Sequence, residues 1–237
     1  MDTKSLSERP WLLLPGTLCT GVVFRAFLDA LDVPQVHRLH IDLEHPSVDD
    51  YCEVLAEAPH DAVVCGFSLG AIVAAHQAHY IRAHSLVLFG LNPHEDDPAK
   101  WQGRVSLRDD VQRWGGAGAM CARRPQVFGP APQEARDTIY RMADRAAHLI
   151  DAQTKLAITR PGALPTLSHA TSQVMCLTGS RDTAAPPTQG RSAAAQAPNG
   201  QFCVLDGLGH FALLEDPQAC ANAVRDLHEV RYDYDYA

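Results

Sequence analysis

Six short apolar runs recur along the chain, and longer amphipathic stretches separate them. All six are rich in Val, Leu or Ile: Trp11–Leu14, Val36–Ile41, Ala62–Cys65, Leu86–Phe89, Gln173–Leu177 and Gln201–Leu205. Several are continuously apolar rather than alternating, which is typical of strands covered on both faces in a parallel sheet. Strands that alternate with helices form right-handed βαβ units. The pattern therefore predicts an α/β fold with a mostly parallel sheet of about six strands.

Two of the intervening stretches begin with helix-start signals. Ser47, followed three residues later by Asp50, has the arrangement of a capping box and predicts a helix through about Glu57. Asp216 and Pro217 predict an N-cap and a first helical residue for a last helix that runs to about Val230.

The interval 92–165 departs from this alternation. It has no convincing strand pattern, its helical pattern is strongest over Glu134–Leu156, and Gly115-Gly116 indicates a loop. It contains 11 Lys and Arg and 9 Asp and Glu, a balance of +2 in a chain whose net charge is −8. We interpret it as a small helical cap, 92–165, inserted into a core formed by 1–91 and 166–237.

A five-residue segment, Gly66-Phe67-Ser68-Leu69-Gly70, matches the pattern G-x-S-x-G between an apolar run and a helix-like run. A serine at such a tight turn is held in strained backbone geometry with its hydroxyl projecting. The residues two before and two after it must be very small, because strand and helix nearly touch there. We predict that Ser68 is a nucleophile; the alternative is an ordinary glycine-rich turn.

A serine hydroxyl is a poor nucleophile at neutral pH and needs a histidine base oriented by a carboxylate. Of the 12 histidines, His210 lies in Gly207-Leu208-Gly209-His210-Phe211, a predicted loop in which glycines free the backbone to aim the ring. His76 and His79 lie on the helix after Ser68 and are predicted to point away from it. We therefore expect His210 to be the base.

Two aspartates compete for the role of orienting acid. Asp182 lies just past the run that ends at Leu177, and the chain order Ser68, Asp182, His210 is that of α/β hydrolases. Asp206, four residues before the histidine, is the main rival. Asp182 is favoured, and Glu215 is interpreted as part of the start of the last helix.

A tetrahedral intermediate needs two backbone N–H donors. One is expected from Leu69, the residue after the nucleophile, at the N-terminus of its helix. The other is expected from the loop after the first apolar run, where Gly16 permits a turn and Thr17 is the donor. The alternative for this loop is a plain β-turn.

Composition and charge exclude several classes of protein. Hydrophobic residues make up 46% of the chain, too many for a disordered chain. With 20 Lys and Arg against 28 Asp and Glu, the net charge has the wrong sign for binding nucleic acid, and we expect no such partner. The 7 cysteines contain no C-x-x-C pair, so zinc-ribbon and thioredoxin-like spacings are absent. Residues 1–10 are polar and Trp11–Leu14 is too short for a membrane span. We expect a cytoplasmic protein with reduced thiols, no metal, no cofactor and no membrane contact.

Taken together, these motifs resemble the α/β-hydrolase superfamily over nearly the whole chain, most closely the small bacterial carboxylesterase branch that includes the biotin-pathway esterase and the menaquinone-pathway α/β-hydrolase. The further matching motifs are Asn92-Pro93, Arg160-Pro161, Gly179-x-x-Asp182, Gly209-His210-Phe211 and Glu215-Asp216-Pro217. Pro15-Gly16 stands where that branch usually has His-Gly, which spares the backbone donor. The first apolar run lies close to the start, so the family's first β-hairpin is expected to be missing or reduced.

The resemblance and the residues together predict a serine hydrolase that cleaves a carboxylic ester or a thioester through an acyl-serine intermediate. The relatively basic cap favours an acyl group carried by an anionic carrier, coenzyme A or a carrier protein; the alternative is that its arginines only solvate helices. A second class, a non-hydrolytic lyase, cyclase or isomerase on the same fold, remains open, as does a binding protein with an unused triad. The large cap side chains Trp101, Trp114, Met120, Phe128, Tyr140 and Met142 are candidates for lining the pocket.

Overall fold

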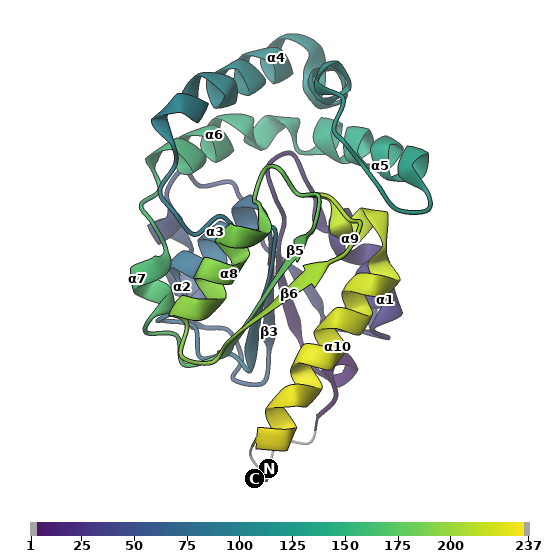
Figure 1. Cartoon of the computed structure of the whole chain (residues 1–237). Coiled ribbons are helices and arrows are strands. Elements are labelled where there is room, and N and C mark those ends of the chain that lie inside the picture. The colour runs from purple at the N-terminus through teal and green to yellow at the C-terminus, as the bar shows by residue number, and fades with distance from the viewer. Residues whose placement is uncertain (1–3, 235–237) are drawn as a thin grey trace.

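The predicted strands form one sheet with the order β2-β1-β3-β4-β5-β6 (Figure 1). The computed structural model describes residues 4–234, with side chains up to residue 229. The strands are β1 (Trp11–Leu14), β2 (Arg38–His40), β3 (Val63–Phe67), β4 (Ser85–Phe89), β5 (Gln173–Gly179) and β6 (Gly200–Leu205). Each neighbouring pair is parallel. The predicted α/β fold with a parallel sheet of about six strands is therefore confirmed.

Helices cover the sheet on both faces (Figure 1). One face packs against α2 (Cys52–Ala56), α3 (Leu69–His76), α7 (Leu164–Leu167) and α8 (Pro187–Gln196), and the other against α1 (Arg25–Ala30), α9 (Ala212–Glu215) and α10 (Pro217–Tyr234). In β1, Leu12 and Leu14 face the first layer, Trp11 and Leu13 face the second, and all four are buried. Burial on both faces is the reason why these strands are continuously apolar.

The edge strand β2 is shorter than predicted. The apolar run Val36–Ile41 forms only Arg38–His40, because its first part is the 3-10 helix η3 (Gln35–His37) that follows Pro34. Val36 is 80% exposed and thus contributes nothing to the core. The remaining 3-10 helices are η1 (Leu6–Glu8), η2 (Gly21–Phe24), η4 (Val48–Tyr51) and η5 (Ala147–Leu149).

Both predicted helix starts are present. Ser47 and Asp50 form the capping box, and the helix begins as η4 before continuing as α2. The carboxylate of Asp216 accepts a hydrogen bond from the backbone N–H of Ala219 at 2.9 Å, as an N-cap does. Helix α10 extends to Tyr234, beyond the predicted end at Val230.

The interval 92–165 contributes three long helices that lie over one end of the sheet (Figure 1). They are α4 (Pro98–Arg123), α5 (Pro132–Arg145) and α6 (Ile150–Thr159), which we call the cap helices. They share a small hydrophobic cluster with Leu18 of the core. The expected division into a core and a cap at residues 92 and 165 stays a prediction.

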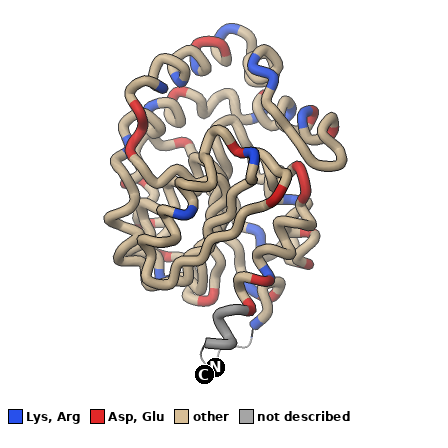
Figure 2. Tube along the Cα trace, in the orientation of Figure 1, with Lys and Arg blue, Asp and Glu red and all other residues tan. Residues whose placement is uncertain are grey.

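The glycine pair in the cap makes a kink rather than a loop. Gly115 has φ 73°, outside the helical region, and the helical turns resume after it. The N–H of Ala117 donates to Asp144 at 2.7 Å, which satisfies a donor that the kink leaves open. Lys and Arg are interspersed with Asp and Glu along these helices (Figure 2). Among residues 4–234, no helix is long and apolar enough to cross a membrane.

A buried histidine on α3 predicts sensitivity of the fold to acid. Burial lowers the pKa of His76 to about 4, although a hydrogen bond to the backbone of Pro161 opposes this shift. An unfolded histidine titrates near ~6.5, so between these values the unfolded chain binds a proton that the folded chain does not. The contribution to stability is fully present above pH ~6.5 and is lost as the pH falls toward 4, about 3 kcal/mol in all.

We therefore expect His76→Gln to flatten the dependence of the free energy of unfolding on pH between about 6.5 and 4. Urea unfolding at several pH values measures this slope. The unsubstituted protein, measured over the same pH range, is the reference. Equal slopes for the His76 variant and the unsubstituted protein would contradict the prediction.

Candidate active site

The strained turn predicted at Ser68 is present between β3 and α3. Ser68 has φ 51° and ψ −113°, a conformation that a residue with a Cβ adopts only under strain. Its N–H donates to the carbonyl of Phe89 at 2.9 Å. A Cβ at Gly66 would lie 2.5 Å from Cα of Ala71, and one at Gly70 would lie 2.0 Å from the carbonyl oxygen of Leu14. Both flanking glycines are therefore required by close backbone contacts.

The structure brings Ser68, His210 and Asp182 into one chain of hydrogen bonds. Nε2 of His210 lies 3.0 Å from Oγ of Ser68, and Nδ1 lies 2.7 Å from Oδ2 of Asp182. The other oxygen of Asp182 accepts the N–H groups of Ala184 and Ala185 at 2.8 and 2.9 Å, which fixes the carboxylate. This arrangement can move a proton from the serine to an imidazole whose tautomer is held by the aspartate.

Gly90, the residue after β4, leaves room for the side chains of His210 and Asp182. Gly90 has φ 58°, and a Cβ there would lie 3.0 Å from Cε1 of His210 and 3.4 Å from Oδ2 of Asp182. The rings of Phe67 and Phe211 pack at 5.2 and 5.7 Å from the His210 ring. Packing on several sides therefore holds the imidazole against Ser68.

The rival aspartate lies in a different hydrogen-bond network. A carboxylate oxygen of Asp206 accepts the hydroxyl of Ser180 at 3.3 Å, and Ser180 in turn accepts the N–H of Gly207 at 2.8 Å. Nδ1 of His210 donates its hydrogen bond to Asp182 instead.

Glu215 has a positioning contact that the sequence did not reveal. It is buried, and its carboxylate accepts the N–H of Gly209 at 2.5 Å. Burial raises the pKa of Glu215, although backbone hydrogen bonds, the largest from Gly209, oppose this shift. Glu215 is the last residue of α9 and not part of the start of the last helix as interpreted from the sequence, so its side chain ties the end of α9 to the loop that carries His210. Only the motif Glu215-Asp216-Pro217 pointed to this position, and it gave no partner.

The loop after β1 lies against Ser68, as predicted. A Cβ at Gly16 would lie 3.0 Å from Cβ of Ser68. Within residues 4–234, the N–H groups of Thr17 and Leu69 donate to no protein acceptor. Leu18 has φ 55° and donates its N–H to the side-chain oxygen of Gln153 at 3.0 Å. Gln153 is therefore a second positioning residue, and no sequence motif marks it.

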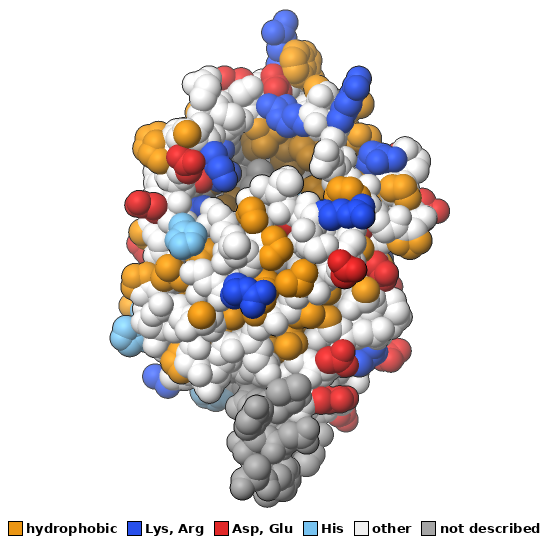
Figure 3. All heavy atoms as spheres, viewed as in Figure 1, with side chains coloured by type: hydrophobic (Ala, Val, Ile, Leu, Met, Phe, Trp, Pro, Cys, Tyr) orange, Lys and Arg blue, Asp and Glu red, His pale blue; other side chains and the backbone are white. Residues whose placement is uncertain are grey.

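A small pocket of about 100 Å³ opens beside Ser68 and His210. Three cations of the cap line it, Lys100, Arg104 and Arg160, together with apolar residues such as Ile72 of α3 and Ala157 of α6. Figure 3 shows a hollow between the cap and the sheet, with Lys and Arg side chains gathered around it. The six large cap side chains proposed for this role do not line the pocket, and Trp101 and Trp114 are 42% and 52% exposed.

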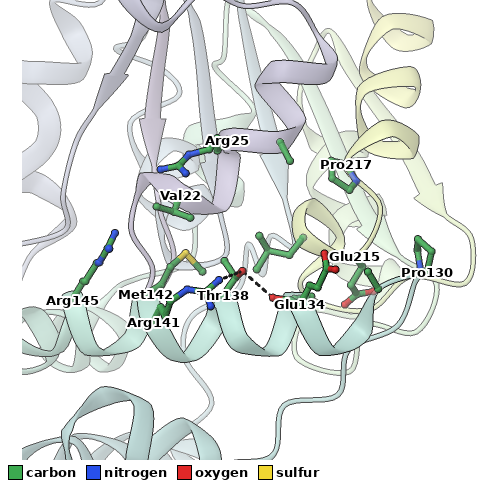
Figure 4. A pocket seen from close by; sticks show the side chains of 14 residues that line it. Val22, Arg25, Pro130, Glu134, Thr138, Arg141, Met142, Arg145, Glu215 and Pro217 are labelled. Carbon is green, nitrogen blue, oxygen red and sulfur yellow. Dashed lines mark hydrogen bonds between the residues drawn. The ribbon is translucent and has the colours of Figure 1, made fainter.

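A larger groove, about 510 Å³ in volume, lies between α5 and the core (Figure 4). Arg25, Arg141 and Arg145 line it together with Glu134 and Glu215. Arg141 donates to the hydroxyl of Thr138 at 2.9 Å. None of the residues proposed to act on a substrate lines this groove, so it is distinct from the pocket beside Ser68.

The sheet is parallel, and a strand-to-helix turn presents a serine. An aspartate and a histidine follow along the chain and form one hydrogen-bonded set with it. These features together define the class of α/β hydrolases. Residues 10–223 match the model of the alpha/beta hydrolase family, and the chain belongs to this family. Membership supports a hydrolase-type activity. No curated protein matches the sequence of the chain.

Solved structures with the same fold are distant in sequence. An esterase from Thermogutta terrifontis, solved with malate bound, is 21% identical with a TM-score of 0.74, covering 93% of this chain and 89% of that one. A carboxylesterase structure from Nitrososphaera gargenis is 14% identical with a TM-score of 0.76, covering 94% and 90%. MenH from S. aureus is 16% identical with a TM-score of 0.74, covering 96% and 95%. These likenesses show the fold.

Proposed function

We propose that the protein is a serine hydrolase that cleaves a carboxylic ester or thioester through an acyl-serine intermediate. The observation that carries this proposal is the hydrogen-bonded chain from Ser68 through His210 to Asp182, on a strained turn beside a pocket. The fold alone would not carry it, because one fold hosts many chemistries.

In the proposed reaction, Oγ of Ser68 attacks the substrate carbonyl while Nε2 of His210 takes the hydroxyl proton. The N–H groups of Thr17 and Leu69, which have no protein acceptor among the described residues, stabilise the oxyanion. His210 then gives its proton to the departing alcohol or thiol, which leaves the acyl group on Ser68. Water, deprotonated by His210, attacks this acyl-serine, and His210 then returns the proton to Oγ of Ser68 as the bond to the acyl group breaks and the acid leaves.

The test is the reaction with a chromogenic activated ester. A serine hydrolase is expected to release a burst of chromophore equal to the concentration of enzyme, with the acyl group found by mass spectrometry on the peptide that contains Ser68. A lyase, cyclase or isomerase on this fold would show slow or absent turnover and no acyl-peptide, and that result would contradict the proposal.

We further propose that the acyl group arrives on an anionic carrier, coenzyme A or a carrier protein. Arg25, Arg141 and Arg145 line one groove together with Glu134 and Glu215, which leaves an excess of one positive charge in that groove (Figure 4). Attraction of this kind acts at long range and is screened as salt shortens the Debye length from about 10 Å at 0.1 M. It should therefore change mainly kcat/KM.

Charge reversal of both arginines, Arg141→Glu with Arg145→Glu, is expected to lower kcat/KM for a coenzyme A thioester at low salt by about tenfold, and by less at high salt. The loss for a small neutral ester of the same acid should be far smaller. The matched control is Arg113→Glu with Arg136→Glu, two cap arginines outside this groove. Identical salt slopes for the charged and the neutral substrate would show that the groove recruits no carrier.

A further inference from the structure

The pocket beside Ser68 has an excess of positive charge. Three of its lining residues are cations, Lys100, Arg104 and Arg160, and no Asp or Glu is among the residues that line it. Two carboxylates lie next to it: Asp96, whose side chain is fully buried beside Arg104 and Arg160, and Asp182, which pairs with His210. Three cations and two carboxylates leave an excess of one positive charge around the pocket.

The carboxylate of Asp96 already forms an ion pair with Arg104. Nε of Arg104 donates to Oδ2 of Asp96 at 2.7 Å, and Nη2 donates to Oδ1, so the two groups form a bidentate pair. Asp96 and Arg104 both lie at the start of the cap, and Arg160, which follows the end of α6, ties the other end of the cap to this pair through Asp96 and the carbonyl of His94. Asp96 therefore has little capacity left for the other cations.

Arg160 is the buried cation whose hydrogen-bonding capacity is only partly satisfied. Its side chain is 1% exposed, and Nη1 donates to the carbonyl of His94 at 2.6 Å. Its Nε and Nη2 have no hydrogen-bond acceptor among the described residues, and Nη2 approaches Asp96 only to 3.7 Å. Burial lowers the pKa of Arg160 to about 10, so it is still protonated at neutral pH. A buried charged donor without an acceptor is costly unless a ligand satisfies it.

The unpartnered edge of Arg160 suits a carboxylate. Nε and Nη2 lie on one edge of the guanidinium, and Arg104 uses the same two nitrogens to hold Asp96. This edge matches the two oxygens of a carboxylate with two parallel hydrogen bonds. Lys100 is exposed at the pocket and has no side-chain partner among the described residues, so it adds an uncompensated positive charge.

We propose that this cluster of Lys100, Arg104 and Arg160 binds a carboxylate of the substrate, so that the enzyme hydrolyses esters or thioesters that carry a free carboxylate within a few bonds of the scissile carbonyl. The inference rests on the proposed hydrolase function. The pocket volume of about 100 Å³ fits a short acidic group rather than a long acyl chain. The carboxylate can belong to the acyl part or to the leaving alcohol, and the experiment separates the two.

The test compares two pairs of substrates in which a carboxylate is replaced by a neutral acetyl group of similar shape. Monoethyl succinate and ethyl levulinate differ in the acyl part, whereas acetoxyacetate and acetoxyacetone differ in the leaving group. We expect kcat/KM to be at least about tenfold higher for the acidic member of one pair, which also shows on which side the carboxylate lies. Equal values within both pairs would overturn the proposal.

The variants test the residues that carry the proposal. Lys100→Met is expected to reduce kcat/KM for the preferred acidic substrate about five- to tenfold more than for its neutral counterpart. Arg160→Lys, which keeps the charge but loses the planar fork, should reduce the preference for the acidic substrate while the thermal midpoint confirms folding. The matched control is Lys155→Met, an exposed lysine of α6 outside the pocket, which should leave the preference unchanged.

A binding measurement keeps failure of this inference separate from failure of the hydrolase function. Monoethyl succinate, or acetoxyacetate, is expected to raise the melting temperature of the Ser68→Ala variant more than its neutral counterpart does, since binding to the folded state alone stabilises it. This readout needs no turnover. If neither acidic ester stabilises the protein more than its neutral counterpart, the carboxylate site is wrong, whatever the assays of hydrolysis show.

Discussion

Replacing Ser68 by alanine is expected to abolish ester hydrolysis, with a loss of at least about 10⁴-fold in kcat, and to abolish labelling by a fluorophosphonate probe. The variant keeps His210 and Asp182 in place. It lacks the hydroxyl oxygen, 3.0 Å from Nε2 of His210, that attacks the carbonyl carbon of the substrate. Folding should be unaffected, because the hydroxyl is at a turn and its removal leaves no large cavity.

The backbone at this position offers a further check on the same residue. Since Ser68 has φ 51° and ψ −113°, glycine can adopt this conformation without the strain that a Cβ causes. Ser68→Gly should therefore be as inactive as Ser68→Ala but have the higher melting temperature. Ser180→Ala is the control for labelling, since Ser180 is an exposed serine after β5. Persistent labelling of Ser68→Ala would place the nucleophile elsewhere.

The parts of the site that the sequence predicted are those carried by local constraints. A serine between two glycines, after a buried strand, leaves few backbone conformations, and the φ of Ser68 and the close contacts at Gly66 and Gly70 agree with that expectation. The loop that carries Asp182 and the loop that carries His210 each follow a predicted strand, so both lie at the carboxyl ends of the strands of a parallel sheet. This shared position brings the two residues within hydrogen-bond distance, although no motif in the sequence shows their contact.

The remaining features depend on contacts between distant segments. Leu18 and Gln153, which hold the loop near Ser68, are separated by 135 positions in the sequence, and no motif marks the pair. Arg160 and Asp96 come together only because the two ends of the cap meet. In the same way, the kink at Gly115 follows from its packing against α5 and from the carboxylate of Asp144, which a single glycine pair does not indicate.

Asp182 and Asp206 are the two candidates for the acid that orients His210, and their different surroundings predict different effects of substitution. Each lies just after the carboxyl end of a strand, Asp182 after β5 and Asp206 after β6, and each precedes His210 in the sequence. Asp182 is 4% exposed, and its Oδ2 lies 2.7 Å from Nδ1 of His210, whereas Asp206 accepts a hydrogen bond from Ser180. A buried carboxylate beside the imidazole stabilises the imidazolium that forms during attack, and the exposed network around Asp206 does not.

Asp182→Asn is accordingly expected to reduce kcat by about 10⁴-fold, because an amide in this position favours the wrong imidazole tautomer and cannot compensate the positive charge on the ring. The matched control is Asp206→Asn, the same substitution at the aspartate that follows the next strand. It is expected to reduce kcat by less than about tenfold. Both variants are measured with one neutral activated ester, together with the melting temperature, so that a loss of activity is not confused with unfolding. The fluorophosphonate reaction gives a second comparison, since it also requires Ser68 to lose its proton to His210. A severe loss in Asp206→Asn with a mild one in Asp182→Asn would mean that the acid acts from β6 rather than from β5, and that the hydrogen bond from His210 to Asp182 only fixes the ring.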